Sequence, residues 1–386
     1  MHTNRTFWPS LRDTRLDGAG GLSSAAPLQQ KGKGMYPFRE GSFAIRNGWY
    51  VAAFSTEIAR EPVGRNILGS PVVLYRNADG TAVAVGGRCP HRHFPLEKGS
   101  LDGDHIVCGY HGLAFAPDGR CVNVPSQDFV PKSFRIPSYP LVEHGLWLWI
   151  WPGDPALADP GLLPDLEAIG FTDPSMSFRP LGMHRVEARY QLINDNLLDL
   201  SHLGFLHGNT IGTPENTSAP EEVRRSDNLL ETRRMIRNCA APPVLAERGY
   251  DIDRIDRDTG GSFYLPGFHT TFGNTSYPQD HSDFAGKMIA KTRVYHGVTP
   301  ATKNSSNYFF AVGLSDPASF ETMTAFLAKV VDEDKFAVEE VEKMIELVGH
   351  LPNELLIKSD RAAVEGRRML QAAMNAESVR EEHQDH

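Results

Sequence analysis

Short apolar segments separated by turn residues dominate the chain between residues 43 and 151. They read as strands because they are rich in Val, Ile, Tyr and Trp and are bounded by Gly, Pro, Asn and Asp. These predicted strands cover residues 44–54, 71–77, 81–87, 105–108 and 136–151. Their close spacing predicts a small antiparallel barrel or sandwich.

The rest of the chain mixes strands with helices. A Pro-rich segment at 151–166 is interpreted as a linker. Beyond it we predict a helix near 187–207, four strands, and two helices from residue 318 to the end; the strands are at 229–237, 262–273, 286–297 and 305–315. This order predicts an α+β protein, in which an all-β domain precedes a domain with helices packed on an antiparallel sheet. We expect the domains to span 35–155 and 156–386, after a disordered extension at 1–34.

Composition narrows the class of protein. The net charge of −9 argues against a nucleic-acid partner. No apolar run approaches the roughly 18 residues of a membrane span, since the densest one, at 146–151, has only the length of a strand. Four cysteines, two of them in the motif described next, suggest a reducing compartment and hence a cytoplasmic protein.

Two Cys/His pairs form the most specific motif, Cys89-Pro-His91 and Cys108-Gly-Tyr-His111. Each pair contains one thiolate and one imidazole. This pattern is typical of a Rieske [2Fe–2S] centre, in which one iron keeps two cysteines and the other takes two histidines. A Cys₂His₂ zinc site is the alternative, although classical zinc fingers pair Cys with Cys and His with His.

A second constellation lies in the apolar segment 194–207, which contains Asp199, His202 and His207. Two histidines and a carboxylate with open positions are typical of non-haem Fe(II) oxygenases. On an ideal helix His202 and His207 would be splayed by about 140°, so they can share a metal only if the helix breaks. Gly204 and Gly208 make such a break plausible. Two buried core histidines are the alternative interpretation.

A third ligand is predicted on the helix at 318–349. By the helical period, Asp334 falls near the centre of the apolar stripe of this helix, Glu333 at its edge and Asp332 on its far side. A carboxylate aimed into a core is costly unless it is paired or bound to a metal. Asp334 is therefore the preferred ligand, with Glu333 second.

Taken together, these motifs resemble those of the Rieske non-haem iron oxygenases, in the branch of vanillate O-demethylase oxygenase and dicamba monooxygenase. The matching stretches are CPHRHFPLEKG, CGYHGLAF, DNLLDLSHLGFLH, NSSNYFFAV and the Glu-Asp pair of the long helix, within about residues 40 to 375. The resemblance implies an N-terminal Rieske domain, a catalytic domain, and three sets of site residues: Cys89, His91, Cys108 and His111 on the cluster; His202, His207 and Asp334 on the iron; and Asp199 as the electron-transfer bridge between the two centres.

The resemblance also implies an activity. It is the O₂-dependent monooxygenation of a small aromatic substrate, with O- or N-demethylation as the expected reaction. Family members work as head-to-tail homotrimers, in which the cluster of one subunit approaches Asp199 of the next. Because the chain contains no flavin or nicotinamide motif, electrons from NAD(P)H are expected to arrive through a separate reductase or ferredoxin. A ring cis-dihydroxylating dioxygenase α subunit is the runner-up. A non-catalytic electron-transfer Rieske protein would leave His202, His207 and Asp334 unexplained.

Two candidate substrate contacts complete the expectations. The segment 263–272 could line an apolar pocket with His269 as its polar contact, although a core histidine is the alternative. Asn307 stands where members of this branch often carry a histidine.

Overall fold

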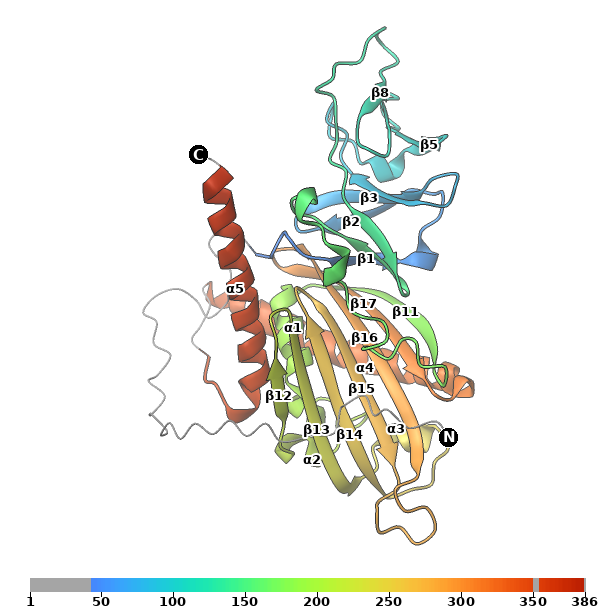
Figure 1. Cartoon of the computed structure of the whole chain (residues 1–386), viewed down its shortest axis with the longest axis vertical. Coiled ribbons are helices and arrows are strands. Elements are labelled where there is room, and N and C mark those ends of the chain that lie inside the picture. The colour runs from blue at the N-terminus through green and yellow to red at the C-terminus, as the bar shows by residue number, and fades with distance from the viewer. Residues whose placement is uncertain (1–42, 350–353, 385–386) are drawn as a thin grey trace.

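The computed structural model describes residues 43–349 and 354–384; the extension at 1–34 therefore lies outside the described residues. Three small antiparallel sheets form the N-terminal region, and one seven-stranded antiparallel sheet forms the C-terminal region (Figure 1). Helices pack against the large sheet. The predicted α+β architecture is confirmed.

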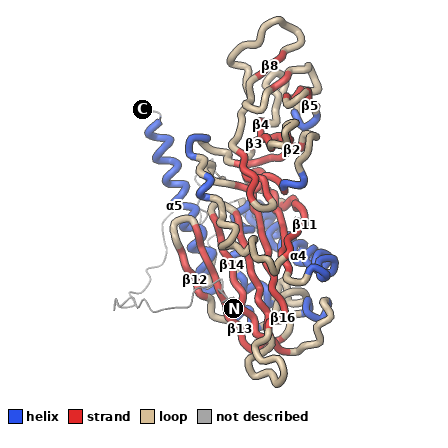
Figure 2. Tube along the Cα trace, turned by 45° about the vertical axis from the view of Figure 1, so that its right-hand side comes forward, coloured by secondary structure: helices blue, strands red, loops and turns tan. Residues whose placement is uncertain are grey.

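The N-terminal sheets have the strand orders β1-β10-β9, β2-β3-β4 and β5-β6-β7-β8. Their strands are β1 (Tyr50–Phe54), β2 (Val63–Ile67), β3 (Ser70–Arg76), β4 (Ala82–Gly86), β5 (Ser100–Asp102), β6 (His105–Val107), β7 (Ala114–Phe115), β8 (Cys121–Asn123), β9 (Leu141–His144) and β10 (Trp147–Ile150). The segment predicted as one strand at 136–151 is a hairpin of β9 and β10, because Gly145 turns the chain with a φ of 66°. The sheet of β5 to β8 forms the tip of the molecule (Figures 1 and 2).

The large sheet has the order β11-β17-β16-β15-β14-β13-β12. Its strands are β11 (Ser177–Val186), β12 (Glu222–Arg225), β13 (Leu229–Ala240), β14 (Arg254–Tyr264), β15 (Phe268–Ser276), β16 (Met288–Thr302) and β17 (Ser305–Leu314). The helices are α1 (Tyr190–Leu198), α2 (Glu215–Ser218), α3 (Pro243–Glu247), α4 (Phe320–Val348) and α5 (Arg361–Gln384). The single strand predicted at 262–273 was wrong. Pro266, which cannot donate a ladder hydrogen bond, lies in the turn between β14 and β15.

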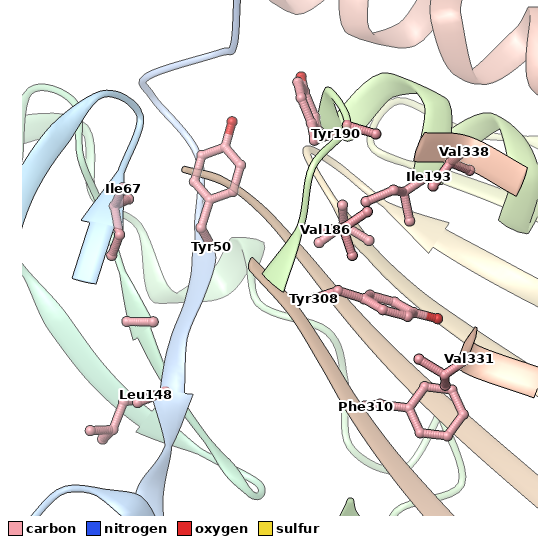
Figure 3. Packing of buried hydrophobic residues seen from close by; sticks show 14 of the residues in the cluster. Tyr50, Ile67, Leu148, Val186, Tyr190, Ile193, Tyr308, Phe310, Val331 and Val338 are labelled. Atoms are coloured by element: carbon pink, nitrogen blue, oxygen red, sulfur yellow. The ribbon is translucent and has the colours of Figure 1, made fainter. Parts of the chain in front are cut away.

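Strand β17 shows how the two regions share a core. Its even-numbered residues Tyr308 and Phe310 pack with residues of α1, α4 and β1 (Figure 3). Its odd-numbered residue Phe309 packs on the opposite face with Trp147 and Trp149 of β10. Both faces of the strand are therefore covered, which explains the apolar run at 308–314. Residues of the Pro-rich segment 151–166 also pack into this second cluster.

Candidate functional site

Two tight loops at the tip carry the Cys/His motif. Cys89 follows β4 and Cys108 follows β6, and each loop closes back on its cysteine. The carbonyl of Cys89 accepts from the amide of His93, and that of Cys108 accepts from the amide of Gly112. A Cβ at Gly109 would lie 2.9 Å from a backbone oxygen of a neighbouring loop, so this close approach requires glycine.

The four motif side chains fit a Rieske cluster. Both thiols are buried and free of disulfides, while the rings of His91 and His111 are exposed, with their centroids 4.5 Å apart. Burial raises the pKa of the Cys89 thiol to about 11. A thiolate in this position therefore needs a positive partner, which an iron–sulfur cluster provides. Two inner sulfurs beneath two outer imidazoles is the donor set that such a cluster uses.

The second site begins where α1 ends. The helix stops at Leu198, and a 3₁₀ turn covers Leu200–Gly204. His202 donates from Nδ1 to the backbone carbonyl of Asp199 (2.5 Å), whereas the Asp199 carboxylate accepts from the amide and hydroxyl of Ser201 at 2.9 and 3.0 Å. Because α1 ends here, the backbone carbonyl of Asp199, and not its carboxylate, is free to accept from His202.

A sharp turn brings His207 beside His202. The ring centroids of the two histidines are 5.1 Å apart, so the predicted helix break is present. Gly212 allows the turn, since a Cβ there would lie 1.7 Å from the carbonyl oxygen of Leu203. His207 Nδ1 lies 2.7 Å from a carboxylate oxygen of Glu333, which fixes the ring from behind.

The free ring nitrogens converge on Asp334. Its Oδ1 lies 3.0 Å from Nε2 of His207 and 3.6 Å from Nε2 of His202. One possible ligand atom from each of the three residues lies within 4.8 Å of the others. Burial lowers the pKa of His202. Burial also disfavours charge on His207, but hydrogen bonds to Asp334 and Glu333 outweigh it and raise the pKa of His207. Two imidazoles and one carboxylate form a fitting donor set for a non-haem iron.

Two supporting residues escaped sequence analysis. Asn196 donates to Asp334 Oδ1 (3.1 Å), and Thr210 donates to the Glu333 oxygen that also faces His207 (3.0 Å). Asn196 precedes His202 by six residues, but its contact with α4 depends on packing between two helices that are far apart in sequence.

A cavity of about 180 Å³ opens beside this cluster, and His202, His207 and Asp334 all line it. Its walls are largely apolar and come from α1, α3, α4 and the helix-covered face of the sheet. They include Leu203, Ile211, Val244, Leu245, Phe272, Val294, Phe310, Met323, Leu327 and Val330. His296 is a polar wall residue whose Nδ1 lies 2.6 Å from the Tyr308 hydroxyl. Burial lowers the pKa of His296 to about 4, so its ring is neutral at neutral pH.

Neither predicted substrate contact lines this cavity. His269 is buried, stacks on Phe263 and donates to Asn194 (2.9 Å), as expected of a core histidine. The amide of Asn307 donates to the backbone of Asn66 in the N-terminal region. Both residues are therefore engaged in packing within the chain.

A second depression lies on the other side of His202. Asp199, Asp195, Leu355 and Arg367 line it, and His202 borders both this depression and the cavity. Leu355 is 94 % exposed.

The described helices include none that is long and apolar enough to cross a membrane.

Comparisons with known proteins agree with this geometry. Residues 48–140 match the Rieske [2Fe-2S] domain, and residues 186–376 match the vanillate O-demethylase oxygenase C-terminal domain. The oxygenase component of dicamba O-demethylase from Stenotrophomonas maltophilia is 34 % identical, over 83 % of this chain and 95 % of that protein. The oxygenase component of chloroacetanilide N-alkylformylase from Rhizorhabdus wittichii is 31 % identical, over 86 % of this chain and 96 % of that protein.

A solved structure gives the same result. Dicamba monooxygenase bound to dicamba superposes with a TM-score of 0.78 at 31 % identity, over 88 % of this chain and 100 % of that one. These similarities exclude the zinc interpretation of the Cys/His motif and favour the monooxygenase prediction over a ring dioxygenase. The cofactors are thus a Rieske [2Fe–2S] cluster and a mononuclear iron, and the relatives are components of multicomponent systems. The chain belongs to the Rieske non-haem iron oxygenases, in the branch of the vanillate and dicamba O-demethylase oxygenase components.

Proposed function

We propose that this oxygenase removes an O- or N-alkyl group from a small aromatic substrate, and that His202, His207 and Asp334 hold its mononuclear iron. The observation that carries the proposal is the convergence of these side chains at the wall of an apolar cavity. The names of the relatives, an O-demethylase and an N-alkylformylase, support the reaction class.

The residues have separate tasks in this reaction. Cys89, His91, Cys108 and His111 hold the cluster. Iron at the triad supplies O₂ activation, and the cluster supplies single electrons. The apolar walls hold the aromatic ring and exclude water, so that the alkyl carbon faces the triad. For a methyl ether, the substrate, O₂, two electrons and two protons give a phenol, formaldehyde and water.

Electron delivery calls for a second subunit. The cluster loops lie at the tip of the molecule, and α1 lies beside the large sheet (Figure 1). We propose a head-to-tail homotrimer in which the tip of one subunit enters the depression around Asp199 of the next, so that Asp199 bridges the two centres. A separate reductase or ferredoxin, drawing on NAD(P)H, recharges the cluster. The four free cysteines are consistent with work in the cytoplasm.

Product analysis tests the proposal. The reduced holoenzyme with its electron donor is mixed with methoxy- and N-methyl-aromatics under O₂, and formaldehyde and O₂ consumption are measured. We expect one formaldehyde per O₂ consumed for at least one compound. Formation of ring cis-diols without formaldehyde would contradict the proposal.

A further inference from the structure

One glycine of the large sheet is not explained by the fold of the chain. Gly273 lies inside β15 and pairs in regular register with both neighbouring strands, whereas the register shift of β15 lies beyond Thr275. A glycine inside a strand weakens the strand, because it loses more conformational entropy on folding and offers no side chain to pack. It therefore usually marks a bulge, a positive φ or a place where another group approaches closely. The regular register excludes a bulge at Gly273.

The chain leaves open space beside Gly273. A Cβ added to this residue would meet no atom within 4 Å beyond its chain neighbours, and its φ lies outside the left-handed region. Every other described glycine either has a positive φ or would place a Cβ within 4 Å of another atom. At Gly260 on the next strand, for example, a Cβ would lie 2.1 Å from the carbonyl oxygen of Thr232. Backbone strain and crowding by the chain are thus excluded for Gly273, and the approach of a ligand remains.

A side chain at position 273 would point into the cavity beside the triad. Gly273 pairs with Thr259 of β14 and with Thr292 of β16, and all three residues line this cavity. Residues paired across neighbouring strands point to the same face of a sheet, because side chains alternate along each strand. Thr271 and Thr275, two residues before and after Gly273, line the cavity as well. The open space at Gly273 is therefore a gap in the sheet floor of the cavity.

The gap lies away from the triad. Burial lowers the pKa of His296 and the charge of Asp334 opposes this shift, which places His296 near the triad. Thr292, the cross-strand partner of Gly273, is four residues from His296 on the same strand. Four residues of strand span about 13 Å. An anisole ring whose methyl carbon faces the triad is shorter than this distance, so the gap is available to a further substituent on the ring.

We propose that Gly273 is a specificity-determining residue, which makes room for an apolar substituent at the end of the aromatic substrate remote from the alkyl group that is removed. The substituent is apolar because the cavity walls are largely apolar. The substrate class is thus an elongated alkyl- or aryl-substituted arene that carries the O- or N-alkyl group at its other end. This inference rests on the proposed function, because it names the substrate class of the same cavity.

Direct binding tests it without turnover. Isothermal titration calorimetry on the holoenzyme compares 3- and 4-alkylanisoles whose alkyl chain grows from methyl to butyl. In at least one of the two series we expect the affinity of wild type to rise by about 3- to 4-fold per added methylene, because each methylene leaves water for the gap. Gly273→Val fills the gap, so it should weaken binding of the butyl compound by about 10-fold or more and of the methyl compound by less than about 3-fold. Gly273→Ala should fall between wild type and Gly273→Val.

A matched control is available on the same strand. Ser276 does not line the cavity, so Ser276→Val should bind both series as wild type does. The variants at position 273 should fold, because the added atoms meet open space at an ordinary φ and valine favours strands. Cluster absorption and iron content report whether each variant is folded, and Gly273→Ala carries the test if Gly273→Val is not.

The outcomes separate this inference from the proposed function. A wild-type affinity that does not rise with chain length in either series overturns the role of Gly273, and so does an equal effect of Gly273→Val on all chain lengths. Formaldehyde release from the alkylanisoles, with a length preference that Gly273→Val leaves unchanged, overturns it too and leaves the dealkylation standing. Binding that depends on chain length and on Gly273, with no formaldehyde from any compound, supports the inference and counts against the dealkylation.

Discussion

At the scale of single residues, two neighbouring carboxylates on α4 have different roles: Asp334 is the proposed iron ligand, and Glu333 orients His207. Glu333 and Asp334 are about 100° apart on the helix and approach His207 from its two ring nitrogens. Asp334 faces Nε2, the nitrogen that we assign to the mononuclear iron, and Glu333 faces Nδ1. A carboxylate behind a ligating histidine fixes its orientation and raises its basicity as a ligand. Helical periodicity predicts Asp334 as the first choice of ligand, but it does not predict that Glu333 supports His207.

Glu333→Ala should therefore weaken iron binding without abolishing it. We expect the affinity for Fe(II) to fall by about 10- to 100-fold, because His207 loses the partner that orients it. Titration of the iron-depleted enzyme against a chelator measures this. The exposed neighbour Asp332 provides the control, since Asp332→Asn should match wild type. Unchanged affinity in Glu333→Ala would argue that Thr210 or the backbone holds His207 instead.

His269 gives the fold a pH dependence. Burial lowers its pKa well below 6.5, so the ring stays neutral in the folded protein while it takes up a proton in the unfolded chain. The unfolded state then binds more protons below about pH 6.5, and the free energy of unfolding falls as the pH drops. One such proton contributes a slope of at most about 1.4 kcal/mol per pH unit.

We expect His269→Gln to flatten this slope between pH 6.5 and 5. Urea unfolding at several pH values in wild type and variant measures the difference, in which the shared contribution of the metal ligands cancels. Parallel stability curves for the two proteins would contradict a neutral buried His269.

At the scale of elements, the features that depend on local sequence patterns could be predicted, whereas those that depend on tertiary contacts could not. The Cys/His loops follow from short spacings, and α4 follows from an apolar stripe close to its observed length. The choice between His269 and His296 could not be read from sequence. The two are direct partners on β15 and β16, and only packing decides which one lines the cavity, because Asn194 of α1 covers His269.

Because α1 ends before Asp199, the backbone of this residue contacts His202 while its carboxylate does not. Because its backbone carbonyl holds His202, Asp199→Asn should leave iron binding intact. The variant loses the carboxylate charge, so we expect turnover to be nearly abolished while both centres stay occupied. Rapid mixing of the reduced enzyme with substrate and O₂ reports cluster reoxidation, which should be strongly slowed. Reoxidation at the wild-type rate would mean that Asp199 is not the bridge, and recovery of activity with added Fe(II) would indicate a role in metal binding only.

On the scale of the whole molecule, the N-terminal and C-terminal regions are joined by shared cores. Residues of β1 pack with α1 and α4, and Trp147 of β10 packs against the other face of the large sheet. This packing fixes the tip at one end of the molecule and the triad beside the large sheet. A proposed neighbour subunit must then supply the short path for electrons.

The exposed apolar rim of the Asp199 depression offers a test of that assembly. Leu355→Asp should weaken the trimer, because a charge would be buried where the neighbouring tip docks. Light scattering after size exclusion should give the mass of three chains for wild type and a smaller mass for the variant. Met288 is exposed on the large sheet outside the depression, so Met288→Asp should remain trimeric. A monomeric wild type would contradict the proposed assembly.

Iron counting tests the central claim, two distinct iron centres held by the assigned residues, most directly. Wild-type enzyme, purified anaerobically and loaded with Fe(II), should contain about three irons per chain, two in the cluster and one at the triad. Asp334→Ala should contain about two, with the absorption and the paramagnetic signal of the reduced cluster unchanged and no activity regained on adding Fe(II). Three irons and full activity in Asp334→Ala would contradict the assigned triad, and stoichiometric zinc without cluster absorption in wild type would contradict the assignment of the cluster.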